Sequence, residues 1–248
     1  MYKLVFLRHG QSLWNLENKF TGWEDVDLST KGKKEAKDSG KLLKINNFKF
    51  DHIYTSALKR AINTMNICIN EMNLKNVNTV YEWRLNERHY GALQGLNKSD
   101  TAKKYGEKQV LIWRRSYDTP PPPLPKSDKQ NLRFAKKYAY LNDFEIPSSE
   151  SLKDTVKRIL PLWEQSIKPT ILSKKKILIV AHGNSIRALI KYIAKVSDKN
   201  IVQLNIPTGV PLIYEFDQRL NPITHYYLGN TKEINKKTSL VEAQGRKI

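Results

Sequence analysis

The chain is poor in cysteine and has no long hydrophobic run. Cys68 is its only cysteine among 248 residues, so no disulfide can form within the chain, which is typical of a reducing compartment. No run approaches the ~20 apolar residues that a membrane helix needs. The apolar start at Leu4–Leu7 is cut off by Arg8, too early for the core of a signal peptide. We therefore expect a soluble, cytoplasmic protein with no membrane partner.

Acidic residues are also scarce relative to basic ones. The chain has 43 Lys and Arg against 24 Asp and Glu, a formal net charge of +19. Such a charge attracts phosphorylated metabolites, nucleic acids or anionic surfaces, although scattered solvated lysines would give the same total. The basic residues form no single segment with interleaved aromatics and match no nucleic-acid motif, so we expect no nucleic acid partner. Charge alone therefore selects no function.

Apolar segments sufficient for a core alternate between strand and helix patterns. Hydrophobic residues make up 40% of the chain. The patterns predict strands at 2–7, 50–54, 79–82, 177–181 and 212–216, and helices at 33–44, 56–72, 152–167 and 185–195. Continuous apolar strands separated by helices favour a mainly parallel sheet covered on both faces. We predict one α/β domain over 1–248, a three-layer α/β/α fold with a doubly wound sheet. An inserted helical lid at about 96–146 and a mobile tail at about 231–248 complete this prediction.

Three polar segments directly follow predicted strands. They are Arg8-His9-Gly10, Thr55-Ser56 with Arg60 further on, and His182-Gly183-Asn184. Doubly wound sheets bind ligands at the carboxyl ends of their strands, in the crevice where the strand order reverses. We therefore expect the three segments to converge on one site.

The residue types in these segments suit phosphoryl chemistry. A lone histidine is commonly structural, but His9 lies between Arg8 and Gly10 at the end of a buried strand. Neutral imidazole is a good nucleophile toward phosphorus, and a guanidinium offers paired donors to phosphoryl oxygens. Gly10 would let the backbone approach a ligand closely. With His182, two imidazoles could flank one transferring group.

Longer motifs extend the pattern over nearly the whole chain. They occupy residues 8–15 (RHGQSLWN), 20–23 (FTGW), 55–61 (TSALKRA), 84–91 (RLNERHYG), 93–98 (LQGLNK), 113–115 (WRR), 150–152 (ESL) and 181–185 (AHGNS). In this order they resemble the histidine phosphatase (phosphoglycerate mutase-like) superfamily. Within it, they are most similar to the family of 2,3-bisphosphoglycerate-dependent phosphoglycerate mutases.

The resemblance implies a role for each matching residue. His9 is the nucleophile that becomes phosphorylated, and Glu87 handles the proton of the attacking or leaving hydroxyl. The transferring phosphoryl group is surrounded by Arg8, Ser12, Asn15, Arg60, His182 and the backbone at Gly183 and Asn184. The carboxylate and the other phosphate of the substrate are held by Thr21, Gly22, Tyr90, Lys98, Arg114 and Arg115. The tail resembles a segment that closes over the pocket.

The implied activity is an isomerase of glycolysis and gluconeogenesis that interconverts 3-phosphoglycerate and 2-phosphoglycerate. Its cofactor is 2,3-bisphosphoglycerate, which primes the enzyme by phosphorylating His9, and the family forms dimers or tetramers. A bisphosphoglycerate synthase or a phosphatase with the same residues stays open. No cluster has the spacing of a metal site, so we predict a metal-independent reaction.

Three positions leave questions that sequence does not answer. Ser56 would cap the helix that carries Arg60 and so place this arginine near a positive helix terminus. Glu87 could instead form a structural ion pair with Arg84 or Arg88. Gln11 stands where the family often has glutamate, which removes a negative charge beside the phosphate pocket.

Overall fold

A six-stranded sheet forms the centre of the structure, a computed structural model that describes residues 1–128 and 131–244. The strand order is β3-β2-β4-β1-β5-β6. The strands are β1 Tyr2–Arg8, β2 His52–Thr55, β3 Asn78–Tyr81, β4 Ile177–Ala181, β5 Pro211–Phe216 and β6 Pro222–Tyr227. The first four pair in parallel, whereas β5 and β6 are antiparallel to their neighbours. The sheet is therefore mainly parallel, as predicted.

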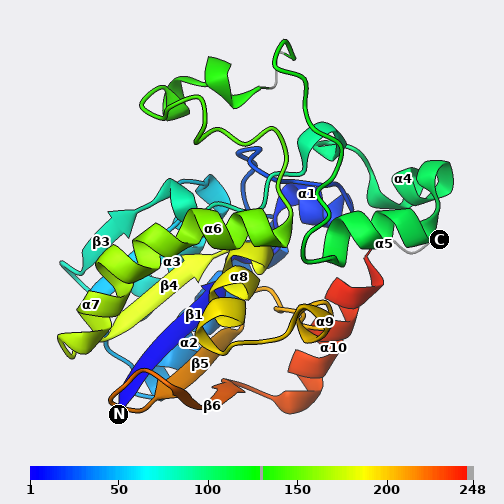
Figure 1. Cartoon of the computed structure of the whole chain (residues 1–248). Helices are drawn as coiled ribbons and strands as arrows, with labels where there is room; N and C mark the ends of the chain where they lie inside the picture. The colour runs from blue at the N-terminus through cyan, green and yellow to red at the C-terminus, as the bar shows by residue number, and fades with distance from the viewer. Residues whose placement is uncertain (129–130, 245–248) are drawn as a thin grey trace.

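Helices cover both faces of this sheet (Figure 1). Helices α2 (Thr30–Ile45) and α3 (Lys59–Glu71) pack on one face, and α6 (Leu152–Leu162) and α8 (Gly183–Ile193) on the other. Successive side chains of β1 point to opposite faces of the sheet. Val5 and Leu7 therefore pack in the core beneath α2 and α3, whereas Phe6 packs in the core beneath α6 and α8. This confirms the predicted three-layer α/β/α fold.

The remaining elements are short, apart from one C-terminal helix. They are α1 Leu13–Leu16, α4 Lys98–Tyr105, α5 Glu107–Arg115, the π-helical turn Trp163–Ile167, α7 Lys168–Leu172, α9 Asp198–Ile201, α10 Thr231–Ala243 and the 3₁₀ turns Trp83–Leu85, Gly91–Leu93, Leu132–Phe134 and Lys136–Tyr138. Within the residues described, no helix is both long and apolar enough to cross a membrane.

One strand was missed from the sequence, and one expected helix start is wrong. Strand β6 was not predicted, because it lies at the edge of the sheet and most of its residues are exposed, so it lacks an apolar pattern. The helix expected from Ser56 begins at Lys59, and its N-cap is Leu58, whose extended backbone has no side-chain cap. The hydroxyl of Ser56 instead accepts a hydrogen bond from the Leu58 amide and contacts His182.

The insertion and the tail lie around the carboxyl edge of the sheet. The stretch predicted as a lid contains α4, α5 and two of the 3₁₀ turns, and it extends beyond the strand ends (green in Figure 1), with 129–130 outside the described residues. The tail forms α10, which runs from the end of β6 toward α5 (Figure 1). The predicted mobility of the tail stays a prediction, and residues 245–248 lie outside the description.

Candidate active site

The sheet topology brings the two predicted histidines together. Strands β1 and β4 are neighbours with Arg8 opposite Ala181, so the residues that follow them lie side by side. The His9 amide donates to the Ala181 carbonyl at 3.0 Å, and the rings of His9 and His182 are 4.9 Å apart between centroids. The expected convergence of these strand ends is confirmed.

The ring of His9 is held in one tautomer. Its Nδ1 lies 2.7 Å from the carbonyl oxygen of Gly10, an acceptor, so Nδ1 carries the proton and Nε2 keeps its lone pair. His9 is 2% exposed. Burial, with the positive charges of Arg60 and Arg8, lowers the pKa of His9 well below its usual value. His9 is therefore neutral at physiological pH, the form in which an imidazole is nucleophilic.

His182 lies in the same dry environment but has different partners. Its Nε2 is 2.7 Å from the hydroxyl of Ser56, which β2 brings next to β4. Its Nδ1 is buried and has no hydrogen-bond partner among the residues described. Burial, with the positive charges of Arg60 and Arg8, lowers the pKa of His182 well below its usual value. Its ring can therefore donate a hydrogen bond to an anion beside His9.

Two buried arginines supply positive charge at this point. Arg8 Nη1 donates to the Ile206 carbonyl at 2.6 Å, and Arg60 donates to the carbonyls of Gly22 and Glu24 at 2.7 Å. The Nε atom of each is buried and has no hydrogen-bond partner within residues 1–128 and 131–244. Burial lowers the pKa of Arg60 to about 10, which leaves its guanidinium charged at neutral pH. Buried charges held only by neutral carbonyls favour the binding of an anion.

The glycine of the first polar segment is needed for packing within the protein. A Cβ atom on Gly10 would lie 2.2 Å from the carbonyl oxygen of Gly32, in the first turn of α2. The Gly10 amide donates to Thr64 Oγ1 of α3. Gly10 thus lets the loop after β1 pack against α2 and α3, and the expectation that it also lets the backbone approach a ligand stays a prediction.

Glu87 is not part of a structural ion pair in the residues described. Its Oε1 accepts hydrogen bonds from the amides of Arg88 at 2.8 Å and Asn184 at 3.2 Å. Arg84 pairs instead with Glu82 and Glu145. The ion-pair alternative for Glu87 is therefore wrong, and its carboxyl group is available to the cavity that it lines.

A small cavity of about 70 Å³ opens beside these groups. It is lined by Arg8, Asn15, Lys19, Thr21, Glu87, Tyr90, Lys98, Arg114, Arg115, Gly183, Asn184, Arg187, Ile206, Val241 and Gln244. Six of these side chains are basic, and Glu87 is the one carboxylate among the described lining residues. Such a cavity is complementary to a small molecule with several negative charges.

Ten of the fifteen predicted site residues line this cavity, and the other five are buried and do not line it. His9, Ser12, Gly22, Arg60 and His182 do not line it. Ser12 forms the N-cap of α1 and exchanges hydrogen bonds with Asn15, which does line the cavity. The side chain of Gln11 accepts from Ser29 at the start of α2 and so is tied to the neighbouring helix.

The far wall combines the insertion with the C-terminal helix. Lys98 Nζ donates to Gln244 Oε1 at 3.2 Å, and Arg115 Nη2 donates to the Val241 carbonyl at 3.4 Å. Burial and the charge of Arg114 lower the pKa of Lys98 well below its usual value. Burial lowers the pKa of Arg114 to about 10. These cations crowd one wall and so favour an anionic ligand.

Sequence reasoning missed five lining residues: Lys19, Arg187, Ile206, Val241 and Gln244. Only Arg187 gave a usable signal, as a single arginine inside the apolar helix that follows His182. No group of three or more potential metal ligands occurs in the described parts of the chain.

Comparison with known proteins gives the class to which this fold and site belong. The sequence model of the histidine phosphatase superfamily (branch 1) matches residues 4–135 and 124–227. The chain therefore belongs to the histidine phosphatase superfamily.

Solved structures share the fold at low sequence identity. A mycobacterial glucosyl-3-phosphoglycerate phosphatase complexed with VO3 is 22% identical with a TM-score of 0.69, over 92% of this chain and 97% of that one. A putative alpha-ribazole-5'-P phosphatase from Escherichia coli is 18% identical with a TM-score of 0.64, over 93% and 98%. Bacillus stearothermophilus YhfR is 22% identical with a TM-score of 0.64, over 87% and 91%.

Proposed function

We propose that the protein is a 2,3-bisphosphoglycerate-dependent phosphoglycerate mutase, which interconverts 3-phosphoglycerate and 2-phosphoglycerate. The observation that carries this proposal is the distribution of charge in the cavity. Arg8 lies on the side of His9, while Lys98, Arg114 and Arg115 form the wall beneath α5 and α10. A phosphate at His9 would therefore leave further cations for the carboxylate and the second phosphate of a bisphosphoglycerate.

In the proposed reaction, the Nε2 lone pair of His9 attacks the phosphorus of 2,3-bisphosphoglycerate. The bond between phosphorus and the ester oxygen breaks, and that oxygen takes a proton from Glu87. In the return step, the hydroxyl of the bound phosphoglycerate attacks the phosphorus of phosphohistidine and gives its proton back to Glu87. The bond between phosphorus and Nε2 breaks, and its electron pair returns to His9. Arg8, Arg60 and His182 stabilise the charge on the transferring group, which is the main requirement of phosphoryl transfer.

Retention of the bisphosphate favours a mutase over a hydrolase. The bisphosphate must reorient and return its other phosphate to His9 before water reaches the phosphohistidine. Val241 and Gln244 of the C-terminal segment cover the cations of the far wall. A closed, dry cavity strengthens the attraction between these cations and a multiply charged intermediate.

A phosphatase is the second candidate, because two of the similar structures above are named as phosphatases. In that reaction, water takes the phosphoryl group from His9. Both candidates share the first step, so they differ only in the fate of the phosphohistidine.

The test compares these fates in one sample. The protein is incubated with 3-phosphoglycerate and saturating 2,3-bisphosphoglycerate in excess chelator, and both 2-phosphoglycerate and inorganic phosphate are measured over time. The proposal predicts that 2-phosphoglycerate forms faster than phosphate is released and that chelator has no effect. Phosphate release that equals or exceeds isomerisation would assign the protein to the phosphatases. A His9→Asn variant, which should lose both products, is the control for contaminating activity.

A further inference from the structure

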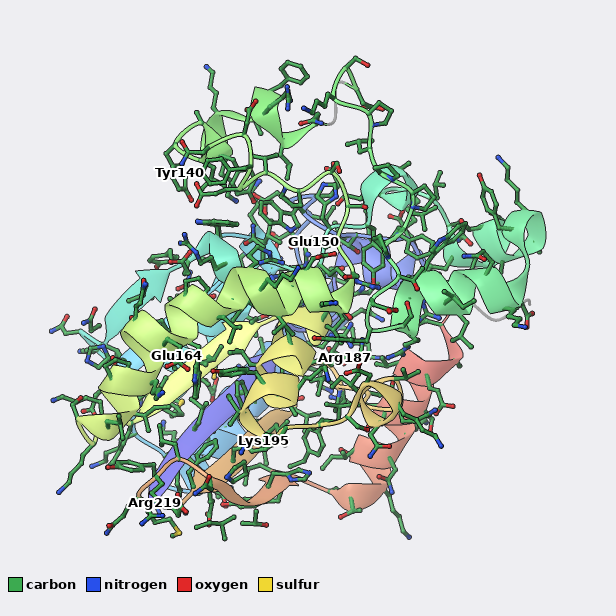
Figure 2. All side chains as sticks on the ribbon, viewed as in Figure 1. Tyr140, Glu150, Glu164, Arg187, Lys195 and Arg219 are labelled. Atoms are coloured by element: carbon green, nitrogen blue, oxygen red, sulfur yellow. The ribbon has the colours of Figure 1, made fainter. Side chains whose placement is uncertain are left out.

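Arg187 is a buried arginine that reaches the cavity from outside the shared motifs. It lies on α8, one turn after Asn184, and is 3% exposed. Figure 2 places it between α8 and the facing ends of α5 and α10, and it lines the cavity with Arg115 and Val241. Its position connects the helix that follows His182 to the far wall of the site.

The contacts of Arg187 lead directly to Asn184. Nη1 donates to Asn184 Oδ1 at 2.7 Å, and Nη2 donates to the Ile201 carbonyl at 2.7 Å. Both terminal nitrogens of the guanidinium thus donate to groups of the protein. Together they fix the side chain of Asn184 relative to α9. The Nε atom is buried with no partner among the residues described.

Asn184 in turn contacts two residues of the proposed chemistry. Its backbone amide donates to Glu87 Oε1 at 3.2 Å, and its Nδ2 donates to Tyr90 Oη at 3.2 Å. Among the described residues, Asn184 thus joins Arg187, Glu87 and Tyr90 through hydrogen bonds of its backbone and its side chain. Arg187 is thus linked to the carboxyl group of Glu87 by two hydrogen bonds, one to the side chain and one from the backbone amide of Asn184.

Packing alone does not explain why an arginine is buried at position 187, because burial of its charge costs free energy. Burial, with the charges of Arg115 and Arg88, lowers its pKa to about 9, and the guanidinium still carries its charge at neutral pH. Its hydrogen-bond acceptors are neutral, and the charge of Glu87 offsets only part of the cost of burying the guanidinium, because the net shift of its pKa is downward. An apolar side chain would fill the same volume without that cost. The arginine is therefore better explained by a task at the site.

We propose that Arg187 is a positioning residue: it fixes Asn184 and thereby keeps the carboxyl group of Glu87 in place for proton transfer. The inference rests on the proposed role of Glu87, but it does not depend on whether the phosphohistidine passes its phosphate to a sugar acid or to water. A shift of about 1 Å in a group that transfers a proton can cost about 100-fold in rate. Loss of Arg187 should therefore slow the chemical step rather than weaken substrate binding.

The test is a double-mutant cycle on the rate of His9 phosphorylation. Arg187→Gln, Glu87→Gln and the double variant are mixed with 2,3-bisphosphoglycerate, and phosphohistidine is quantified after rapid quenching. We expect Arg187→Gln to slow phosphorylation about 10- to 100-fold at saturating donor, with a half-saturating donor concentration within about threefold of wild type. In the Glu87→Gln background, the same substitution should cost less than about twofold, because the group that it positions is gone.

Two further variants separate positioning from folding. Arg187→Lys keeps one donor and should recover part of the rate. Lys191→Gln removes a cation one turn further along α8 that donates to the Val196 carbonyl and does not line this cavity, so it should leave the rate unchanged. Equal losses from Arg187→Gln with and without Glu87, or a loss confined to donor affinity, would overturn the proposal. A loss of the same size in Lys191→Gln would also overturn it.

The experiment distinguishes failure of the proposed mutase function from failure of the proposal for Arg187. If the wild type isomerises nothing but His9 is still phosphorylated, the mutase proposal fails while the cycle reports on Arg187 as before. If 2,3-bisphosphoglycerate does not phosphorylate His9, the same four proteins are compared by the release of phosphate from 3-phosphoglycerate, whose leaving oxygen needs the same proton.

Discussion

At the scale of single residues, the site depends on a histidine that stays neutral. His9 is buried, and two arginines lie near it. Burial and both positive charges disfavour the imidazolium form of its ring. The Gly10 carbonyl alone favours the charged ring, and it also fixes the tautomer that leaves Nε2 free. In the proposed reaction, His9 would therefore need no general base to act as the nucleophile.

This environment predicts how His9 titrates. A base with a lowered pKa becomes protonated only at a pH below that of an ordinary histidine, whose pKa is about 6.5. The ¹⁵N shifts of the His9 ring should therefore show no titration midpoint between about pH 8 and about pH 6 and should report a proton on Nδ1. Arg60→Gln, which removes one positive charge, should move the midpoint upward. A midpoint near 6.5 in the wild type would contradict the described electrostatics.

The residues of the site could be predicted from the sequence only where they belong to a recognisable motif. His9, His182 and Arg8 follow apolar strands, so their convergence follows from general rules of parallel sheets. The sequence could not decide whether Glu87 forms an ion pair or keeps a free carboxyl group. The answer depends on the tertiary structure, in which Arg84 pairs with Glu82 and Glu145. The packing of Gly10 against Gly32 likewise needed the position of α2.

At the scale of elements, the C-terminal helix α10 completes the cavity. It contributes the Val241 carbonyl, which accepts from Arg115, and Gln244 just beyond it accepts from Lys98. This helix buries little side-chain surface, because Ile234 is its only buried residue in the part described. The helix can therefore be removed with little cost to the sheet while the far wall is opened to water.

Deletion of residues 231–248 tests this role. We expect the truncated protein to fold, to bind 3-phosphoglycerate more weakly and to release at least about threefold more phosphate per isomerisation, because water then reaches the phosphohistidine. The measurement is the ratio of phosphate to 2-phosphoglycerate, with circular dichroism to verify the fold. Lys232→Gln, an exposed change at the start of α10, is the matched control and should keep the ratio of the wild type. An unchanged ratio in the truncated protein would show that α10 does not exclude water.

The fully buried strand β4 could be predicted with correct bounds, whereas two largely exposed elements were missed. β4 is buried along its whole length, and its predicted bounds match the structure. β6 is exposed along most of its length, and α10 is polar with one buried residue, so neither has a periodic apolar pattern. The helix start at Lys59 was missed because Ser56 contacts His182 instead of capping the helix.

At the scale of the whole molecule, the strand order explains why distant segments form one site. β1 lies between β4 and β5, and β4 lies between β1 and β2, so the loops after β1, β4 and β2 meet at one edge. The insertion and the C-terminal helix close this edge from outside the sheet. The part of the candidate site at the strand ends thus follows from the sheet, whereas its outer wall could be located only in the folded chain.

The measurement that tests the central claim most directly is the location of the phosphoryl group. The protein is incubated with 2,3-bisphosphoglycerate, quenched in alkali to preserve phosphohistidine, digested and mapped by mass spectrometry. The account predicts one acid-labile phosphoryl group on His9, and no labelling or turnover in His9→Ala. A phosphoryl group on another residue, or turnover retained by His9→Ala, would contradict it.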